Sequence, residues 1–221
     1  MKLARKYSFD TYGAGRSTIV TLKNSFHGRT METLTATGQD ELHQYFDPFP
    51  PGFRYAAAND LDALKAAIDE TVCAVMMEPV QGEGGVQPLD ADFVHKASEL
   101  CREKDILLIF DEVQTGVGRT GKLYAWEHFG VRPDILTSAK GLGGGLPVGA
   151  CLCVERLGAV MGPGTHGSTF GGNPIVLRGG VRGAFPHGGA ALQQVRQRAR
   201  SCRIRFPNVM KFVEIRGIGP D

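Results

Sequence analysis

Two polar side chains follow apolar runs at places where a sheet could present them to a ligand. Asp111 comes directly after the run 106–110 (ILLIF), and Lys140 follows Ile135 and Leu136 at a short interval. A carboxylate there can cap a turn or meet solvent, but it can also face a ligand that needs a fixed negative charge, such as a protonated pyridine nitrogen. A lysine amine can form a Schiff base with an aldehyde when it is unprotonated, although a lysine beside a glycine-rich loop is often merely exposed.

The surroundings of Lys140 bear on the second possibility. Five residues follow it as Gly-Leu-Gly-Gly-Gly, and glycines let the backbone turn sharply beside a bulky ligand. Partial burial and nearby positive charge would favour the neutral amine. We therefore keep Lys140 as a candidate for covalent chemistry.

Two nucleotide-binding motifs are nearly matched and are disfavoured. Residues 116–122 (GVGRTGK) match most of a P-loop, but Leu123 stands where a Ser or Thr would hold magnesium. The glycines after Lys140 do not extend to the dinucleotide pattern GxGxxG, because the sixth position is Leu146.

The elements that must position these residues form an alternating pattern. Strands are predicted over 17–22, 72–77, 106–110 and 148–154, with a shorter one at Ile135 and Leu136. Helices are predicted up to about Tyr12, over 61–70 with Asn59 or Asp60 as N-cap, and over 92–104 with Phe93, Val94, Ala97, Leu100 and Cys101 on one face. Apolar strands alternating with helices indicate an α/β fold around a mostly parallel central sheet with flanking helices. Ligands bind such sheets at the carboxyl ends of the strands.

Composition excludes several other classes of protein. A formal net charge of +2 over 221 residues favours neither nucleic acid nor membrane as a partner. No apolar run approaches the ~18 residues that span a bilayer, and the first residues lack the apolar core of a secretory signal. Five cysteines without a CxxC pair predict free thiols in a reducing cytoplasm and no metal site.

Five motifs, taken together and in order, carry a resemblance to a known family. They are 24–30 (NSFHGRT), 78–85 (EPVQGEGG), 110–116 (FDEVQTG), 138–140 (SAK) and 166–174 (HGSTFGGNP). Their order and spacing resemble the class III (subgroup II) aminotransferases, which depend on pyridoxal 5'-phosphate (PLP), and most closely the acetylornithine and succinylornithine type. The resemblance covers roughly residues 1–175 and implies the large-domain core of PLP-dependent transferase fold type I.

The resemblance implies roles in cofactor binding. Lys140 resembles the lysine that holds the cofactor and shuttles a proton, and Asp111 resembles the partner of the ring nitrogen. Phe26 resembles the aromatic residue that stacks on the ring. Gln114 resembles the donor to the ring 3-oxygen, with Val113 packed behind the ring. The implied cofactor-binding set is Phe26, His27, Asp111, Val113, Gln114, Lys140 and Thr169, with Lys140 and Asp111 as the catalytic residues.

The substrate-binding residues implied by the resemblance are Arg29, Glu83 and Ser168. Arg29 resembles the arginine that binds the α-carboxylate of an ornithine-type substrate, and its planar fork suits a carboxylate. Glu83 resembles the glutamate that distinguishes the two half-reactions, and Glu78 in the same loop resembles a supporting residue. Thr169 resembles a residue that reaches the cofactor phosphate of a neighbouring subunit, which implies a homodimer.

The implied reaction is a ping-pong transfer of an amino group in the cytoplasm. The δ-amine of N-acetylornithine, or of a related acylated ornithine, would pass by way of the cofactor to 2-oxoglutarate and give glutamate, as in arginine biosynthesis. The alternatives are a truncated, non-catalytic relative, or another class III enzyme such as an ornithine or 4-aminobutyrate aminotransferase or an aminomutase.

The sequence also departs from the family. Residues 1–175 are expected to form a PLP-binding large domain that lacks its N-terminal part, and 176–221 a divergent remnant leading into the C-terminal small domain. Residues 176–205 hold many arginines and no acid. This run can mark a nucleic-acid tail, but we interpret it as a reading-frame disturbance or a damaged gene copy, and we expect it to pack poorly. The chain alone is expected to be nearly inactive, because the phosphate-binding loop of the family precedes the matched region.

Overall fold

The computed structural model describes residues 1–177 and the backbone of 211–213. The chain divides into two compact units. Unit 1 holds Met1–Asp111 and Trp126–Asp134, and unit 2 holds Glu112–Ala125 and Ile135–Asp221. The predicted boundary after residue 175 stays a prediction, and the tail predicted to pack poorly lies, from residue 178 to 205, outside the described residues.

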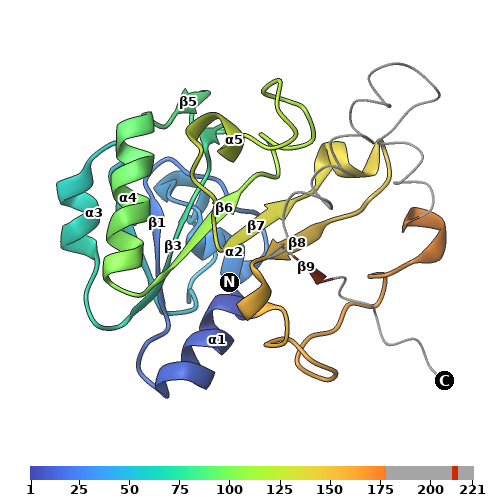
Figure 1. Ribbon diagram of the computed structural model, residues 1–221, viewed down its shortest axis with the longest axis horizontal. Coiled ribbons are helices and arrows are strands. Elements are labelled where there is room, and N and C mark those ends of the chain that lie inside the picture. Colours follow the sequence, from blue (N-terminus) through green and yellow to red (C-terminus); the bar gives the residue numbers. More distant parts are fainter. Residues whose placement is uncertain (178–210, 214–221) are drawn as a thin grey trace. The chain divides into compact units, whose positions relative to one another are not determined.

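Unit 1 is built on a wholly parallel sheet with the strand order β2-β1-β3-β6 (Figure 1). Its strands are β1 (Thr18–Leu22), β2 (Phe53–Ala56), β3 (Val72–Met77) and β6 (Leu107–Asp111). Every residue of β3 and β6 is buried. Continuous apolar runs are typical of strands that are covered on both faces, and this burial fits that pattern.

Helices surround this sheet. They are α1 (Lys2–Tyr12), α2 (Met31–Ala36), α3 (Leu61–Ala67), α4 (Ala91–Glu103) and α5 (Trp126–Phe129), with a 3-10 turn at Asp40–Leu42. A small antiparallel pair, β4 (Val80–Gln81) and β5 (Gln87–Pro88), lies between β3 and α4 in the chain. Figure 1 shows α3 and α4 side by side on one face of the sheet.

The main core of unit 1 lies between that sheet face and α3 and α4. Alternate strand residues point to the same face, and the strand side chains in this core include Val20, Leu22, Val75, Met77, Leu108 and Phe110. The helix side chains that pack on them include Leu64, Phe93, Val94, Ala97 and Leu100. The buried stripe of α4 is the one predicted from its helical spacing.

The predicted N-terminus of the second helix is confirmed. The Asp60 side chain accepts a hydrogen bond from the Ala63 N–H at 2.9 Å, so Asp60 rather than Asn59 is the N-cap. The helix ends at Ala67, three residues before the predicted end. In contrast, α2 and β2 were not predicted.

Strand register brings three chain segments to one edge of the sheet. Val20 pairs with Val75, and Met77 pairs with Phe110. Because β1, β3 and β6 run parallel, the residues that follow β1 and β3 emerge beside the last residue of β6, which is Asp111. This carboxyl edge is where a parallel sheet presents ligand-binding side chains.

Unit 2 contains the antiparallel strands β7 (Ile135–Ser138), β8 (Ala150–Cys153) and β9 (Lys211–Val213), in that order. Short 3-10 turns follow β7 and β8, at Lys140–Gly143 and Glu155–Leu157. The strands predicted at Ile135 and Leu136 and over 148–154 are confirmed, the latter shortened at both ends. Among the described residues, no helix is both long and apolar enough to cross a membrane.

Candidate active site

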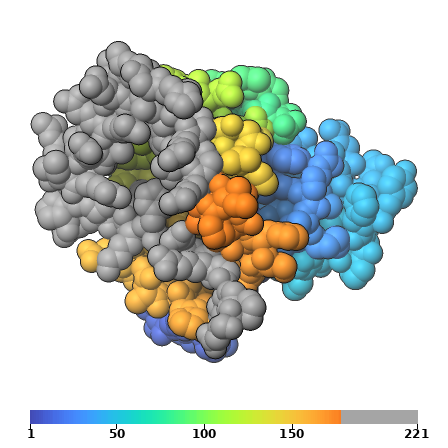
Figure 2. All heavy atoms as spheres, turned by 90° about the vertical axis from the view of Figure 1, so that its right-hand side faces the viewer, coloured from blue at the N-terminus to red at the C-terminus, as the bar shows by residue number. Residues whose placement is uncertain are grey.

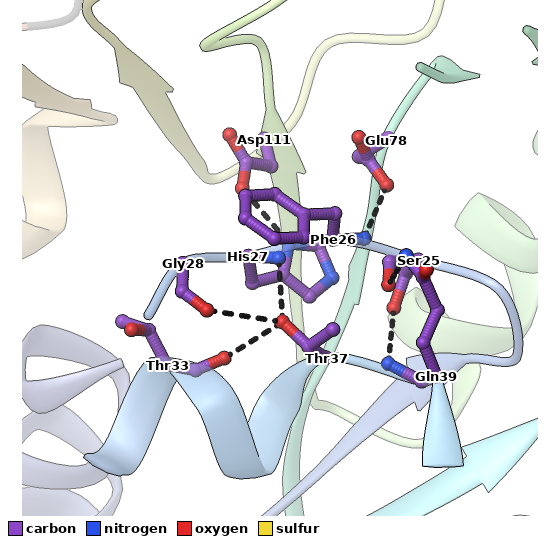
Figure 3. Close-up of polar contacts among 10 residues, drawn as sticks. Ser25, Phe26, His27, Gly28, Thr33, Thr37, Gln39, Glu78 and Asp111 are labelled. Atoms are coloured by element: carbon purple, nitrogen blue, oxygen red, sulfur yellow. Dashed lines mark hydrogen bonds and ion pairs between the residues drawn. The ribbon is translucent and has the colours of Figure 1, made fainter. Parts of the chain in front are cut away.

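A buried histidine–carboxylate pair lies at the carboxyl edge of the unit 1 sheet. Asp111 ends β6 and is 6% exposed, and the His27 side chain is fully buried. His27 Nδ1 lies 2.8 Å from Asp111 Oδ2 (Figure 3). Because an ionised carboxylate only accepts hydrogen bonds, the Nδ1–H of His27 donates. The other ring nitrogen, Nε2, is buried and has no hydrogen-bond partner within the described part of the chain.

The loop that carries His27 is closed by Thr37. The Thr37 hydroxyl accepts from the His27 backbone N–H at 2.9 Å and donates to the Thr33 carbonyl at 3.0 Å (Figure 3). Gly28, the residue after His27, has a φ of 136°, and a Cβ atom at this position would lie 2.6 Å from the Thr33 hydroxyl oxygen. Only glycine therefore allows this close approach of the loop to α2.

Glu78 fixes the backbone at Phe26. It directly follows β3, is 3% exposed, and its Oε2 accepts from the Phe26 N–H at 2.9 Å (Figure 3). Burial raises the pKa of the Glu78 carboxyl to about 7, and the neighbouring Asp111 charge acts in the same direction. The hydrogen bonds from Phe26 and Gly82 and the charge of His27 lower the pKa and partly offset that effect.

A second contact ties the loop of Glu83 to the same segment. The Gln81 side chain is 1% exposed and its Nε2 donates to the Lys23 carbonyl at 2.9 Å. Gly84 packs on the Asn24 backbone so closely that a Cβ would lie 2.4 Å from its carbonyl oxygen. Glu83 itself is exposed and lines a cleft of about 530 Å³. Other residues lining the cleft include Lys23, Gln39, Glu41 and Tyr55.

The predicted stacking and carboxylate-binding residues of unit 1 lie together. The Arg29 guanidinium carbon is 5.4 Å from the centre of the Phe26 ring, which is a cation–π contact. Arg29 is exposed and Phe26 is half-buried. Both side chains are thus open to a ligand while the loop beneath them is fixed by buried hydrogen bonds.

In unit 2, Lys140 begins the 3-10 turn two residues after the end of β7. Its φ is 45°, in the left-handed region that side chains other than glycine rarely adopt. Such backbone strain concentrates at functional sites. The structure leaves Lys140 exposed, so the partial burial that would favour a neutral amine is not present in the described chain.

The remaining predicted site residues also belong to unit 2. Val113 and Gln114 are half-buried at the start of the loop that follows β6. Ser168 and Thr169 are exposed, and the Ser168 hydroxyl accepts from the Gly171 N–H at 3.0 Å. The predicted site is therefore divided between the units, with Phe26, His27, Arg29, Glu83 and Asp111 in unit 1 and the other residues in unit 2.

Sequence reasoning missed three polar residues that hold these loops. They are Thr37, Gln81 and Glu112, and all three are buried. Gln81 and Glu112 lie inside the matched motifs, beside residues that we predicted to belong to the site. Their polar character at these positions was the signal that could have identified them. Among the described residues, no cluster of three or more His, Cys, Asp or Glu side chains could hold a metal ion.

Comparison with known proteins identifies the family of this chain. The family model described as "Aminotransferase class-III" matches residues 1–178. A succinylornithine transaminase of Salmonella paratyphi A is 58% identical over 175 residues, which are 79% of this chain and 43% of that protein. The one from Citrobacter koseri is 57% identical over the same shares. The chain thus spans less than half the length of the curated relatives that it matches.

Solved structures show the same fold. An ornithine aminotransferase from Toxoplasma gondii superposes with a TM-score of 0.80 at 36% identity, covering 93% of this chain and 49% of that one. A Plasmodium falciparum ornithine δ-aminotransferase gives a TM-score of 0.69, also at 36% identity, and covers 83% and 43% of the two chains.

The parallel sheet and the polar residues at its carboxyl edge define a PLP-dependent transferase core of fold type I. The chain belongs to the class III aminotransferase family, whose members depend on PLP.

Proposed function

We propose that this chain carries the PLP-binding part of an aminotransferase that transfers the δ-amino group of an acylated ornithine to 2-oxoglutarate. The observation that carries the proposal is the buried His27–Asp111 pair at the carboxyl edge of the unit 1 sheet. Family membership indicates the class of reaction, and the pair contains the buried carboxylate of Asp111 that this reaction requires.

The residues present fit the cofactor. A pyridine ring nitrogen that must stay protonated needs an acceptor with a lasting negative charge, and Asp111 supplies a buried carboxylate for this purpose. The hydrogen bond from His27 orients that carboxylate at the carboxyl edge of the sheet. PLP, when bound, supplies the electron sink. We propose that Phe26 stacks on its ring, that Val113 packs behind the ring, and that Gln114 donates to the ring oxygen.

Lys140 would carry both covalent attachment and proton transfer. Its amine would hold the cofactor aldehyde, and once released it would move the proton between the reacting carbons. The left-handed backbone at Lys140 fixes the direction in which its side chain leaves the chain. Asp111 and Lys140 are thus the two residues that we propose as catalytic.

The substrate assignment rests on Arg29 and on the relatives. An exposed arginine held against Phe26 offers a planar, charged fork for the α-carboxylate, and Glu83 and Ser168 would complete the substrate site. Relatives named succinylornithine transaminase are 58% identical to this chain, whereas the ornithine aminotransferase structures are 36% identical. This difference favours an acylated ornithine, with N-succinyl- and N-acetylornithine as the candidate donors.

We further propose a homodimer, in which Thr169 contacts the cofactor phosphate of the partner. Exposed apolar side chains support an interface: Phe170 is 85% exposed, and Tyr45 and Phe46 are 93% and 50% exposed on one loop of unit 1. Figure 2 shows this loop region, in light blue, at the surface. The domain assignment proposed is a large domain over 1–175, followed by 176–221 leading into the small domain.

A cytoplasmic location is also part of the proposal. Cys73, Cys101, Cys151 and Cys153 are free thiols. Burial raises the pKa of Cys73 and of Cys101, to about 11 and about 12, which keeps both as unreactive thiols.

Cofactor trapping tests the proposal directly. The chain is incubated with PLP, reduced with borohydride and digested, and the labelled peptide is identified by mass spectrometry. The expected label lies on Lys140. Labelling of another lysine while Lys140 stays unmodified would overturn the assignment. Single-turnover loss of the bound cofactor's absorbance with N-succinylornithine, N-acetylornithine, ornithine and 4-aminobutyrate then ranks the amine donors, and a preference for 4-aminobutyrate would contradict the substrate class.

A further inference from the structure

We infer that Glu112 is a positioning residue, whose buried carboxylate closes the loop 112–125 and thereby fixes the backbone at Lys140. The inference rests on the proposed function for the roles of Lys140 and Gln114. Glu112 is fully buried in unit 2. Its Oε2 accepts from the Thr115 hydroxyl at 2.9 Å and from the Ala125 N–H at 2.6 Å.

These contacts join the two ends of one loop. Glu112 begins the loop and Ala125 ends it, so a single carboxylate oxygen holds positions that are 13 residues apart. The Glu112 carbonyl also accepts from the Gly116 N–H at 2.9 Å, which turns the chain directly after Gln114. The closed loop is thus held from within, by one carboxyl oxygen that accepts hydrogen bonds from both Thr115 and Ala125.

The closed loop touches the chain on both sides of Lys140. The Glu112 N–H donates to the Thr137 carbonyl at 3.0 Å, and the Tyr124 hydroxyl donates to the Ser138 hydroxyl at 3.3 Å. Both partners lie in β7, just before Lys140. On the far side, a Cβ built at Gly141 would lie 3.3 Å from the Val117 Cβ, so Val117 packs on the backbone of Gly141.

Backbone strain at Val117 and at Lys140, the residue before Gly141, indicates that the closed loop holds this contact in place. Val117 has a φ of 58° and Lys140 a φ of 45°, and a β-branched residue with positive φ is a marked outlier. Such conformations persist where the surroundings over-determine them. Opening the loop would release Val117, remove its contact with Gly141, and let the chain at Lys140 relax.

The experiment measures amide hydrogen exchange in the full chain without PLP, and PLP affinity separately. Glu112→Ala removes the acceptor and should speed exchange about tenfold over residues 113–125 and also over 139–145, with PLP affinity falling about tenfold. Glu112→Gln, which keeps an acceptor oxygen, should restore part of both effects. Val117→Ala leaves the loop closed and should speed exchange over 139–145 alone.

The controls separate positioning from general damage. Glu103→Ala removes an exposed glutamate at the end of α4 and should leave both exchange and PLP affinity unchanged. If Glu112→Ala does not fold, Thr115→Val removes the Thr115 donor to Glu112. The same pattern of faster exchange and weaker PLP binding is then expected, with smaller changes.

Faster exchange confined to 113–125 in Glu112→Ala, or exchange raised equally in β3 of unit 1, would overturn the inference. The exchange experiment needs no cofactor. A wild-type chain in which borohydride never attaches PLP to Lys140 would therefore refute the proposed function. The effect of the loop on the backbone at Lys140 would then still be decided by hydrogen exchange alone.

Discussion

Replacing Glu78 tests how unit 1 holds the backbone of Phe26. Burial raises the pKa of the Glu78 carboxyl from its ordinary 4.5 to about 7, so the folded protein binds this proton more tightly than the unfolded chain does. The contribution of Glu78 to stability is therefore fully present below about pH 4.5 and is lost as the pH rises through about 7.

Glu78→Gln removes the titration and keeps an oxygen that can accept from the Phe26 N–H. With pKa values of 4.5 unfolded and about 7 folded, linkage gives a loss of about 1 kcal/mol at about pH 5 and about 3 kcal/mol at about pH 8 in the wild-type chain. The variant lacks this loss. Its free energy of unfolding, relative to wild type, should therefore rise by about 2 kcal/mol between these two pH values.

Urea unfolding without cofactor measures this difference, followed by circular dichroism and by the fluorescence of the single tryptophan, Trp126. Other titrating groups occur in both proteins and cancel in the comparison. Glu103→Gln, at an exposed glutamate, controls for the loss of any carboxyl group. If the difference in the free energy of unfolding between Glu78→Gln and wild type stays constant to within about 0.5 kcal/mol across this pH range, burial does not raise the pKa of Glu78.

Three further changes test the fold and the site. Asp60→Ala removes the N-cap of α3 and should lower the free energy of unfolding by about 1 kcal/mol; no change in urea unfolding would mean that the bond to Ala63 contributes nothing. Gln81→Leu should cost about 1–3 kcal/mol, because it leaves a backbone carbonyl without its donor; an unchanged stability would argue against this contact. His27→Leu removes the hydrogen bond from His27 to the Asp111 carboxylate and should weaken PLP binding in a fluorescence titration, whereas His27→Asn should bind PLP better than His27→Leu; equal affinities in wild type and both variants would refute the role of the pair.

Long elements with a clear period were predictable from the sequence, and short ones in turn-rich surroundings were not. The six residues of β3 form one apolar run, and α4 has a full buried stripe, so local pattern determines both. The six-residue α2 is too short for its period to be recognised. The strand β2 follows Pro50, Pro51 and Gly52, residues typical of a loop, and three of its four residues are only half-buried.

The site shows the same division between local and long-range information. Asp111 and Lys140 could be chosen because each follows a predicted strand, and that is a local signal. The contact between His27 and Asp111 joins residues that are 84 positions apart, and it depends on the register of three strands. Sequence pattern alone does not give that register, so the resemblance supplied His27 as a candidate without showing what it touches.

The exposed side chains that we propose as functional share one mode of support. Arg29, Glu83 and Lys140 are each exposed on a loop or turn, where a long side chain has much freedom to lose on binding. Near each of them, a buried polar side chain fixes the backbone through hydrogen bonds: Thr37, Gln81 and Glu112, respectively. Because these bonds are shielded from water, they hold the loop without covering the functional group. We therefore expect the placement of these exposed groups to depend on the buried polar residues that support the backbone beside them.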